Sequence, residues 1–185
     1  AGILTLGALM PYAIFRQKHY LVENSRYGTS SFEPVFTGRD VYGIAIRAFA
    51  LLLLGGLMAG AAHLLGPFAF IGLVAAMAVY LLAFAYFTAN IGNVIYNDTT
   101  LARLGFESTL DTKELAKIYF TNWLMLLFTL GLAYPWTKVR LARYRAEHLA
   151  LEVYGSLDNF IAAEEKQVGA LGEEVGEAFD MDIGL

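Results

Sequence analysis

The sequence predicts an all-α membrane protein built around a transmembrane helical hairpin, with a third apolar helix, interfacial amphipathic helices and short surface strands. Of the 185 residues, 57% are hydrophobic and only 16% are charged. Soluble domains carry about 25% charged residues. The missing charge is concentrated in three long apolar runs, as expected of segments that face lipid.

Two of these runs form the predicted hairpin. A bilayer core about 30 Å thick requires roughly 20 apolar residues in a helix. Residues 42–65 contain two basic side chains, Arg47 and His63, and no acidic one, while residues 68–91 contain neither kind. Gly66 and Pro67, which separate the runs, are typical of a turn. The sequence therefore predicts two antiparallel spans.

The third run, residues 118–134, is short for a span, and a buried helix of a soluble protein is the alternative. We expect it to span, because aromatic residues typical of membrane interfaces mark both of its ends. Those residues are Tyr119 and Trp123 at one end and Tyr134 and Trp136 at the other.

The orientation of this third run conflicts with the charge pattern. Lys and Arg residues flank the hairpin on both sides, which places both flanks in the cytoplasm by the positive-inside rule. A third span would put the next group of cations outside, against that rule. The run is therefore either re-entrant or part of an inverted repeat.

The spans belong to a predicted membrane domain, residues 1–150, which is followed by an acidic tail, residues 152–185. Residues 1–15 resemble the end of an apolar helix and lack a signal-peptide pattern. We therefore expect the sequence to be the C-terminal portion of a longer protein. Residues 27–32 and 99–106 mix β-branched and aromatic side chains with glycine, which favours short surface strands.

An internal repeat relates the two ends of the membrane domain, with seven identities at an offset of 124 positions. In each copy Thr-Leu-Gly ends an apolar helix, proline stops it and an amphipathic helix follows. The second amphipathic helix, residues 137–151, is strongly basic and is expected to lie among lipid headgroups. The identical pairs are Thr5 and Thr129, Leu6 and Leu130, Gly7 and Gly131, Pro11 and Pro135, Arg16 and Arg140, Tyr20 and Tyr144, and Glu23 and Glu147.

The second copy resembles the YjgN-like family of bacterial inner-membrane proteins, whose function is unknown. The resemblance rests on residues 129–136 (TLGLAYPW), on the Lys and Arg residues that follow, on Asn122, and on segments 96–99 and 172–185. It covers most of the chain from Thr5 onwards. It implies a multi-pass protein of the bacterial inner membrane with a longer N-terminus, and it implies no reaction.

Candidate functional residues are of two kinds. Gly56 and Gly60 form a GxxxG motif, which permits close helix packing in lipid, here within the hairpin or in a homo-oligomer. The candidates for contact with lipid headgroups are the cations Lys138, Arg140, Arg143, Arg145, Arg16 and Lys18.

The residue inventory argues against catalysis. There is no cysteine, the three histidines lack a metal-binding spacing, and no Gly-x-Ser-x-Gly motif occurs. We therefore predict no catalytic residues, no metal and no cofactor, and the charge pattern gives no support for nucleic-acid binding. The expected partner is the phospholipid membrane. The favoured function is a non-enzymatic scaffold or accessory protein that engages lipid or a membrane partner, and the alternative is a subunit of a transporter or channel.

Overall fold

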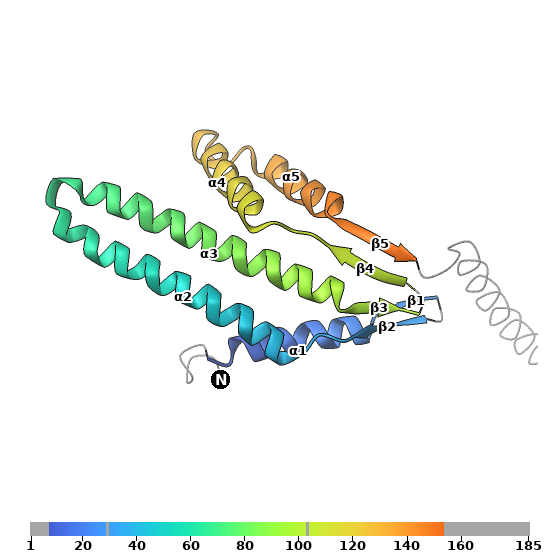
Figure 1. The fold of residues 1–185 in the computed structure, drawn as a ribbon. Helices are drawn as coiled ribbons and strands as arrows, with labels where there is room; N and C mark the ends of the chain where they lie inside the picture. Colours follow the sequence, from blue (N-terminus) through green and yellow to red (C-terminus); the bar gives the residue numbers. More distant parts are fainter. Residues whose placement is uncertain (1–7, 29, 103, 154–185) are drawn as a thin grey trace, which may run out of the picture.

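A computed structural model describes residues 8–28, 30–102 and 104–153 as helices that extend from a small antiparallel sheet (Figure 1). The sheet lies at one end of the molecule, and the α2–α3 hairpin reaches farthest from it. In chain order the elements are α1 (Met10–Glu23), β1 (Arg26–Tyr27), β2 (Ser30–Pro34), α2 (Gly38–Ala62), a 3-10 turn (His63–Phe68), α3 (Ala69–Asn97), β3 (Thr99–Leu101), β4 (Leu104–Ser108), α4 (Thr112–Phe128), α5 (Tyr134–Glu147) and β5 (Leu149–Val153).

The predicted hairpin is confirmed as two long apolar helices packed side by side. Helices α2 and α3 are both long and apolar enough to cross a membrane, and only 17% of the most apolar segment of each is buried. Gly66 turns the chain between them with a positive φ of 53°, a conformation that glycine adopts at little cost. Both helices extend beyond the predicted ranges at their sheet ends.

Small residues line the contact between α2 and α3. A Cβ atom at Gly55 would lie 2.9 Å from the Tyr80 ring, whereas one at Gly56 would be 3.5 Å from the Tyr80 hydroxyl and one at Gly60 would meet nothing within 4 Å. Four of the five buried residues of α3 are alanines: Ala76, Ala83, Ala85 and Ala89. The structure therefore assigns the closest approach to Gly55 rather than to the predicted pair Gly56 and Gly60.

The third apolar run is not one helix over residues 118–134. Helix α4 begins earlier, because the Asp111 side chain accepts hydrogen bonds from the backbone N–H groups of Lys113 and Glu114 and so caps its N-terminus. It ends at Phe128 in a Schellman motif, in which the Gly131 N–H donates to the Leu126 carbonyl at 2.8 Å. Helix α5 then runs back towards the sheet (Figure 1).

The strands form one antiparallel sheet in the order β1-β2-β3-β4-β5. Tight turns join β1 to β2 and β3 to β4, whereas β2 to β3 and β4 to β5 are joined by helical hairpins. Strands β1 to β4 overlap the two predicted strand segments. The predicted interfacial helix, 137–151, differs from the structure: α5 ends at Glu147, and β5 follows because its backbone pairs with β4.

The 124-residue repeat coincides with α1 and α5, each 14 residues long. Both lead into strands of the same sheet, so the two copies have the same orientation and are not inverted. The Thr5-Leu6-Gly7 part of the first copy and the acidic tail from residue 154 lie outside the described residues.

A second repeat, which the sequence analysis missed, has an offset of 74 positions. It relates β2 to β4, both five residues long, and the start of α2 to the start of α4. Val41 and Leu115, which correspond under this offset, are 1% and 0% exposed. Each is therefore the buried anchor of its helix against the layer formed by α3. The molecule repeats a unit of helix, β-hairpin and helix.

Candidate functional site

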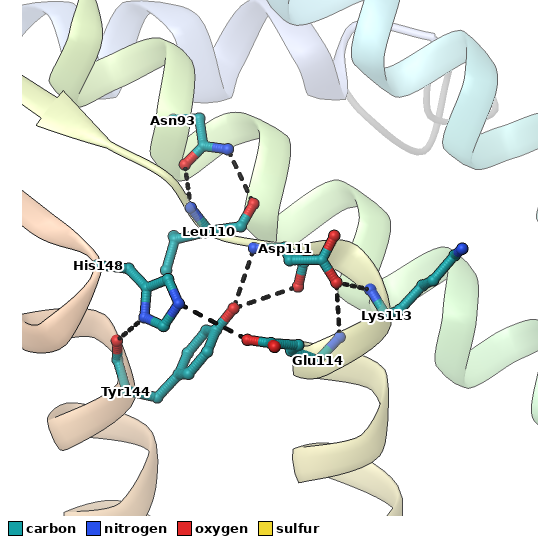
Figure 2. A network of polar contacts seen from close by, with 7 residues as sticks. All are labelled: Asn93, Leu110, Asp111, Lys113, Glu114, Tyr144 and His148. Atoms are coloured by element: carbon teal, nitrogen blue, oxygen red, sulfur yellow. Dashed lines mark hydrogen bonds and ion pairs between the residues drawn. The ribbon is translucent and has the colours of Figure 1, made fainter.

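Polar side chains gather where α3, α4 and α5 meet the sheet, a region that we call the polar junction (Figure 2). Its members come from four elements and from the links between β4 and α4 and between α5 and β5, and none of them lies in the apolar tips of the hairpins. The polar junction consists of Asn93, Asn97, Ser108, Asp111, Glu114, Tyr144 and His148.

Asn93 on α3 fixes the segment that leads into α4. Its Nδ2 donates to the Leu110 carbonyl at 3.0 Å, and its Oδ1 accepts from the Leu110 N–H at 3.0 Å and from Ser108 Oγ at 2.8 Å. One turn later, Asn97 Oδ1 accepts from the Ser108 N–H at 2.5 Å. Two amides on one face of α3 thus satisfy backbone groups that the end of β4 would otherwise leave unpaired.

Tyr144 connects α5 to the start of α4. Its hydroxyl accepts a hydrogen bond from the Asp111 N–H at 3.0 Å, and the side chain is 7% exposed. Burial raises the pKa of the Tyr144 hydroxyl above its ordinary value, and the hydrogen bond from Asp111 opposes that shift only in part. The hydroxyl therefore stays protonated and serves as a fixed link between the two helices.

His148 makes a second connection between α5 and α4. Its Nδ1 lies 2.9 Å from the Tyr144 carbonyl, an acceptor only, so Nδ1 carries a proton. Its Nε2 lies 3.6 Å from Glu114 Oε2, a contact that becomes an ion pair when the ring is protonated. The His148 and Tyr144 rings also pack together, with centroids 4.2 Å apart.

The hydrogen bonds of the polar junction connect neighbouring elements of the fold. Within the described ranges every buried side-chain nitrogen and oxygen has a hydrogen-bond partner. No three His, Asp or Glu residues there are close enough together to hold a metal ion. The amides, the hydroxyl and the imidazole hold α3, α4, α5 and β4 in register, and none is arranged as a nucleophile beside a base.

The six predicted headgroup cations lie on two corresponding helices. Arg16 and Lys18 are exposed on α1, and Lys138, Arg140, Arg143 and Arg145 are exposed on α5. None forms an ion pair with an acidic residue of the described part of the chain. Arg140 donates to Thr121 Oγ1 at 2.7 Å and to Asn122 Oδ1 at 3.3 Å, which ties α5 to the middle of α4.

An apolar groove of about 250 Å³ lies between the end of α1, the end of α3 and the sheet. Phe32 on β2 and Phe106 on β4, which correspond under the 74-residue offset, stack in its wall with centroids 6.0 Å apart. Val22 and Ile95 complete most of the lining. Ser25, Tyr96 and Thr99 also line it, and none of these described lining residues is charged.

Comparison with known proteins identifies the family. Residues 1–178 match the family model described as "Bacterial protein of unknown function (DUF898)". The chain belongs to this family. The match confirms a bacterial family of unknown function for nearly the whole DUF898 chain, as the resemblance in the second repeat copy implied. No curated protein and no solved structure gives a significant match to it.

The polar junction of this DUF898 chain was largely missed by sequence reasoning. The sequence analysis used Tyr144 only as a repeat position and gave His148 no role. A signal was present: Asn93 and Asn97 are four residues apart, so they share one face of a helix. Their partner on β4, however, becomes visible only once the sheet is known.

Proposed function

We propose that this protein is a non-enzymatic scaffold or accessory protein of the bacterial inner membrane, related to the YjgN-like proteins. In this proposal α2 and α3 cross the bilayer and hold the sheet at one membrane surface. The cations of α1 and α5 bind lipid headgroups at that surface, where a membrane-protein partner or a second copy of the chain also docks.

The exposed apolar surface of the α2–α3 hairpin carries this proposal. Residues 48–97 contain no Asp, Glu, Lys or Arg. Large side chains along both helices point outwards; they include Phe49, Leu53, Leu57, Phe70 and Val74. A water-soluble monomer rarely exposes an apolar surface of this extent, because its contact with water is unfavourable. Lipid removes that cost.

The polar groups within the hairpin support a structural rather than a transport role. Thr88 Oγ1 donates to the Phe84 carbonyl and Asn90 Nδ2 donates to the Tyr86 carbonyl, so each bonds to its own helix. Residues 42–65 and 68–91 contain no acidic residue that could carry a proton or bind a cation.

One observation favours the alternative, a subunit of a transporter or channel. The units related by the 74-residue and 124-residue offsets have the same orientation, and parallel repeats occur in several transporter folds. Measurement of ion and solute flux across vesicles that contain the purified protein distinguishes the two functions. A flux above that of empty vesicles would favour the transporter.

Purification of the intact protein in a mild detergent tests the scaffold. We expect anionic phospholipid, with or without a protein partner, to copurify reproducibly. The double variant Arg143→Gln/Arg145→Gln should retain several-fold less of this lipid. Arg26→Gln/Arg39→Gln, which also removes two exposed cations but lies outside the α4–α5 hairpin, is the matched control and should retain it. Equal lipid content in all three proteins would contradict the proposed role of α5.

A further inference from the structure

We propose that the α4–α5 hairpin inserts into a single leaflet, from the side on which the sheet lies, and that it binds the anionic phospholipid of that leaflet. Its apolar tip enters the acyl chains and its cations bind phosphates. This deepens the proposed function and depends on it for the orientation of α2 and α3. The charge pattern left two arrangements open, a re-entrant segment and an inverted repeat, and this inference favours the re-entrant segment.

Large apolar side chains at the tip of the α4–α5 hairpin are strongly exposed. Leu130, Leu132 and Phe128 are 93%, 86% and 81% exposed, and Trp136, at the start of α5, is 74% exposed. Leu130 also adopts a positive φ of 50°. That conformation is uncommon for a leucine and completes the turn, so the turn presents leucines where polar residues would usually occur.

The length of the hairpin matches one leaflet. The uncharged part of α4, Ile118–Phe128, has 11 residues and rises about 16 Å. Half of a hydrocarbon core is about 15 Å. Helix α3, by comparison, has 29 residues and rises about 43 Å, enough for the whole bilayer. Figure 1 shows the α4–α5 tip ending well short of the α2–α3 turn.

The charge on the hairpin changes sharply with distance from the tip. Residues 118–137 carry none, and the first cation, Lys138, lies six residues beyond Leu132, or about 9 Å along the helix. Arg145 lies about 20 Å from Leu132. Residues 115–146 contain no acidic residue. A surface with an apolar end and only cations behind it is complementary to acyl chains and phosphates rather than to a soluble protein.

The natural absence of cysteine allows the side of the membrane to be tested on the full chain. Single cysteines replace three exposed residues: Ser31 on β2, Leu64 at the α2–α3 turn and Ala142 on α5. The protein is reconstituted in vesicles and labelled with a membrane-impermeant thiol reagent. We expect Ala142→Cys to label with Ser31→Cys, from the side opposite Leu64→Cys.

The outcomes separate this inference from the proposed function. If Ser31→Cys and Leu64→Cys label from the same side, the α2–α3 hairpin does not cross and the proposed function fails. If those two label from opposite sides and Ala142→Cys follows Leu64→Cys, α4 crosses the bilayer. In that case only the single-leaflet inference is overturned.

The depth of the hairpin can be read from its own fluorescence, because Trp123 and Trp136 are the only two tryptophans of the chain. They flank the tip at five and four residues from Phe128 and Leu132, so both should lie about 6–8 Å less deep than it. The variants Trp123→Phe and Trp136→Phe each leave one fluorescent tryptophan, and the double variant, which has none, gives the background signal. We expect both reporters to be quenched alike, more strongly by lipids brominated near the middle of the acyl chain than at its end.

Vesicle composition completes the test. In phosphatidylcholine vesicles that also contain phosphatidylglycerol, quenching should exceed that in pure phosphatidylcholine, because the cations of α5 gain anionic partners. Equal quenching in the two kinds of vesicle would contradict the proposal that these cations bind headgroups. Absence of quenching, or strongest quenching at the end of the acyl chain, would overturn insertion into a single leaflet.

Discussion

The two helical hairpins extend from the same sheet but are held in place by different forces. The α2–α3 hairpin packs through small residues, with Gly55 against Tyr80 as its closest contact. The α4–α5 hairpin is held at its base by a hydrogen bond that Asn93 donates to the Leu110 carbonyl and by one that Tyr144 accepts from the Asp111 N–H. In lipid, close packing and polar contacts are the two main sources of helix association, and this chain uses one for each hairpin.

The difference follows from length and position. The α2–α3 hairpin reaches farthest from the sheet, so contact along its own seam must hold its far end together (Figure 1). The base of the shorter α4–α5 hairpin lies beside the sheet, where the α3 amides and the β4 backbone are within reach. Repeated units with related starts, at Val41 and Leu115, have therefore acquired different stabilising contacts.

The largest effect is expected from Asn93→Leu. It leaves the Leu110 N–H and carbonyl without their partner, and such unpaired groups cost about 1–3 kcal/mol each. We expect a loss of about 2–4 kcal/mol, with faster hydrogen exchange in α4 and α5 than in α2. Asn90→Leu, which loses only a bond to its own helix, is the control and should cost less than about 1 kcal/mol. Equally faster exchange in both hairpins would contradict a polar junction specific to α4–α5.

A smaller loss is expected from Gly55→Leu, which addresses the other hairpin. The added side chain would overlap the Tyr80 ring and push α2 from α3, at a cost of about 1–3 kcal/mol. Thermal unfolding in detergent, followed by circular dichroism, measures it. Gly60→Leu is the control, because nothing lies within 4 Å of a Cβ there. If both variants melt alike, the seam between the helices does not run through Gly55.

Tyr144→Phe tests the connection between α5 and α4 with one atom removed. The Asp111 N–H loses its partner, and we expect a loss of about 1 kcal/mol in the free energy of unfolding. Tyr134→Phe, in which an exposed hydroxyl is removed from the same helix, should leave stability unchanged. A loss of the same size in Tyr134→Phe would mean that removal of any hydroxyl from α5 matters, not this bond.

The long hairpin was predictable because its signal is local. Residues 42–65 and 68–91 are apolar over almost their whole length, and a helix that faces lipid needs no finer side-chain pattern. The short hairpin was harder, because residues 118–134 are also apolar throughout. The Schellman turn at Leu130 and Gly131 divides them. The Thr-Leu-Gly motif of the repeat predicted that an apolar helix ends there, but the positive φ of Leu130 has no signal in the sequence.

Strand β5 and the polar junction depended on contacts distant in sequence. Residues 149–151 continue the apolar spacing of α5, so the sequence favoured helix, but β4 offers them a pairing edge more than 40 residues away. The cations of α1 and α5 are exposed on corresponding helices, and a cluster of Lys and Arg is visible in the sequence without the fold. Their role at the membrane remains a prediction.

The smallest effect is expected at the sheet ends of the two hairpins, where the carboxylates of Asp111 and Asp98 have different surroundings. Asp111 caps α4, whereas Asp98, just after α3, has a pKa raised by burial and by the nearby charge of Asp40. A folded-state pKa above the unfolded value means that Asp98 stabilises the fold when protonated, and that this stabilisation is lost as pH rises through the folded pKa. Asp98→Asn should therefore melt at the same or a slightly higher temperature than the natural protein at pH 7, and any gain should shrink on acidification.

The exposed carboxylate of Glu107 on β4 provides the control, Glu107→Gln. A variant Asp98→Asn that melts lower at pH 7 would show instead that the Asp98 carboxylate stabilises the base of the long hairpin as an anion.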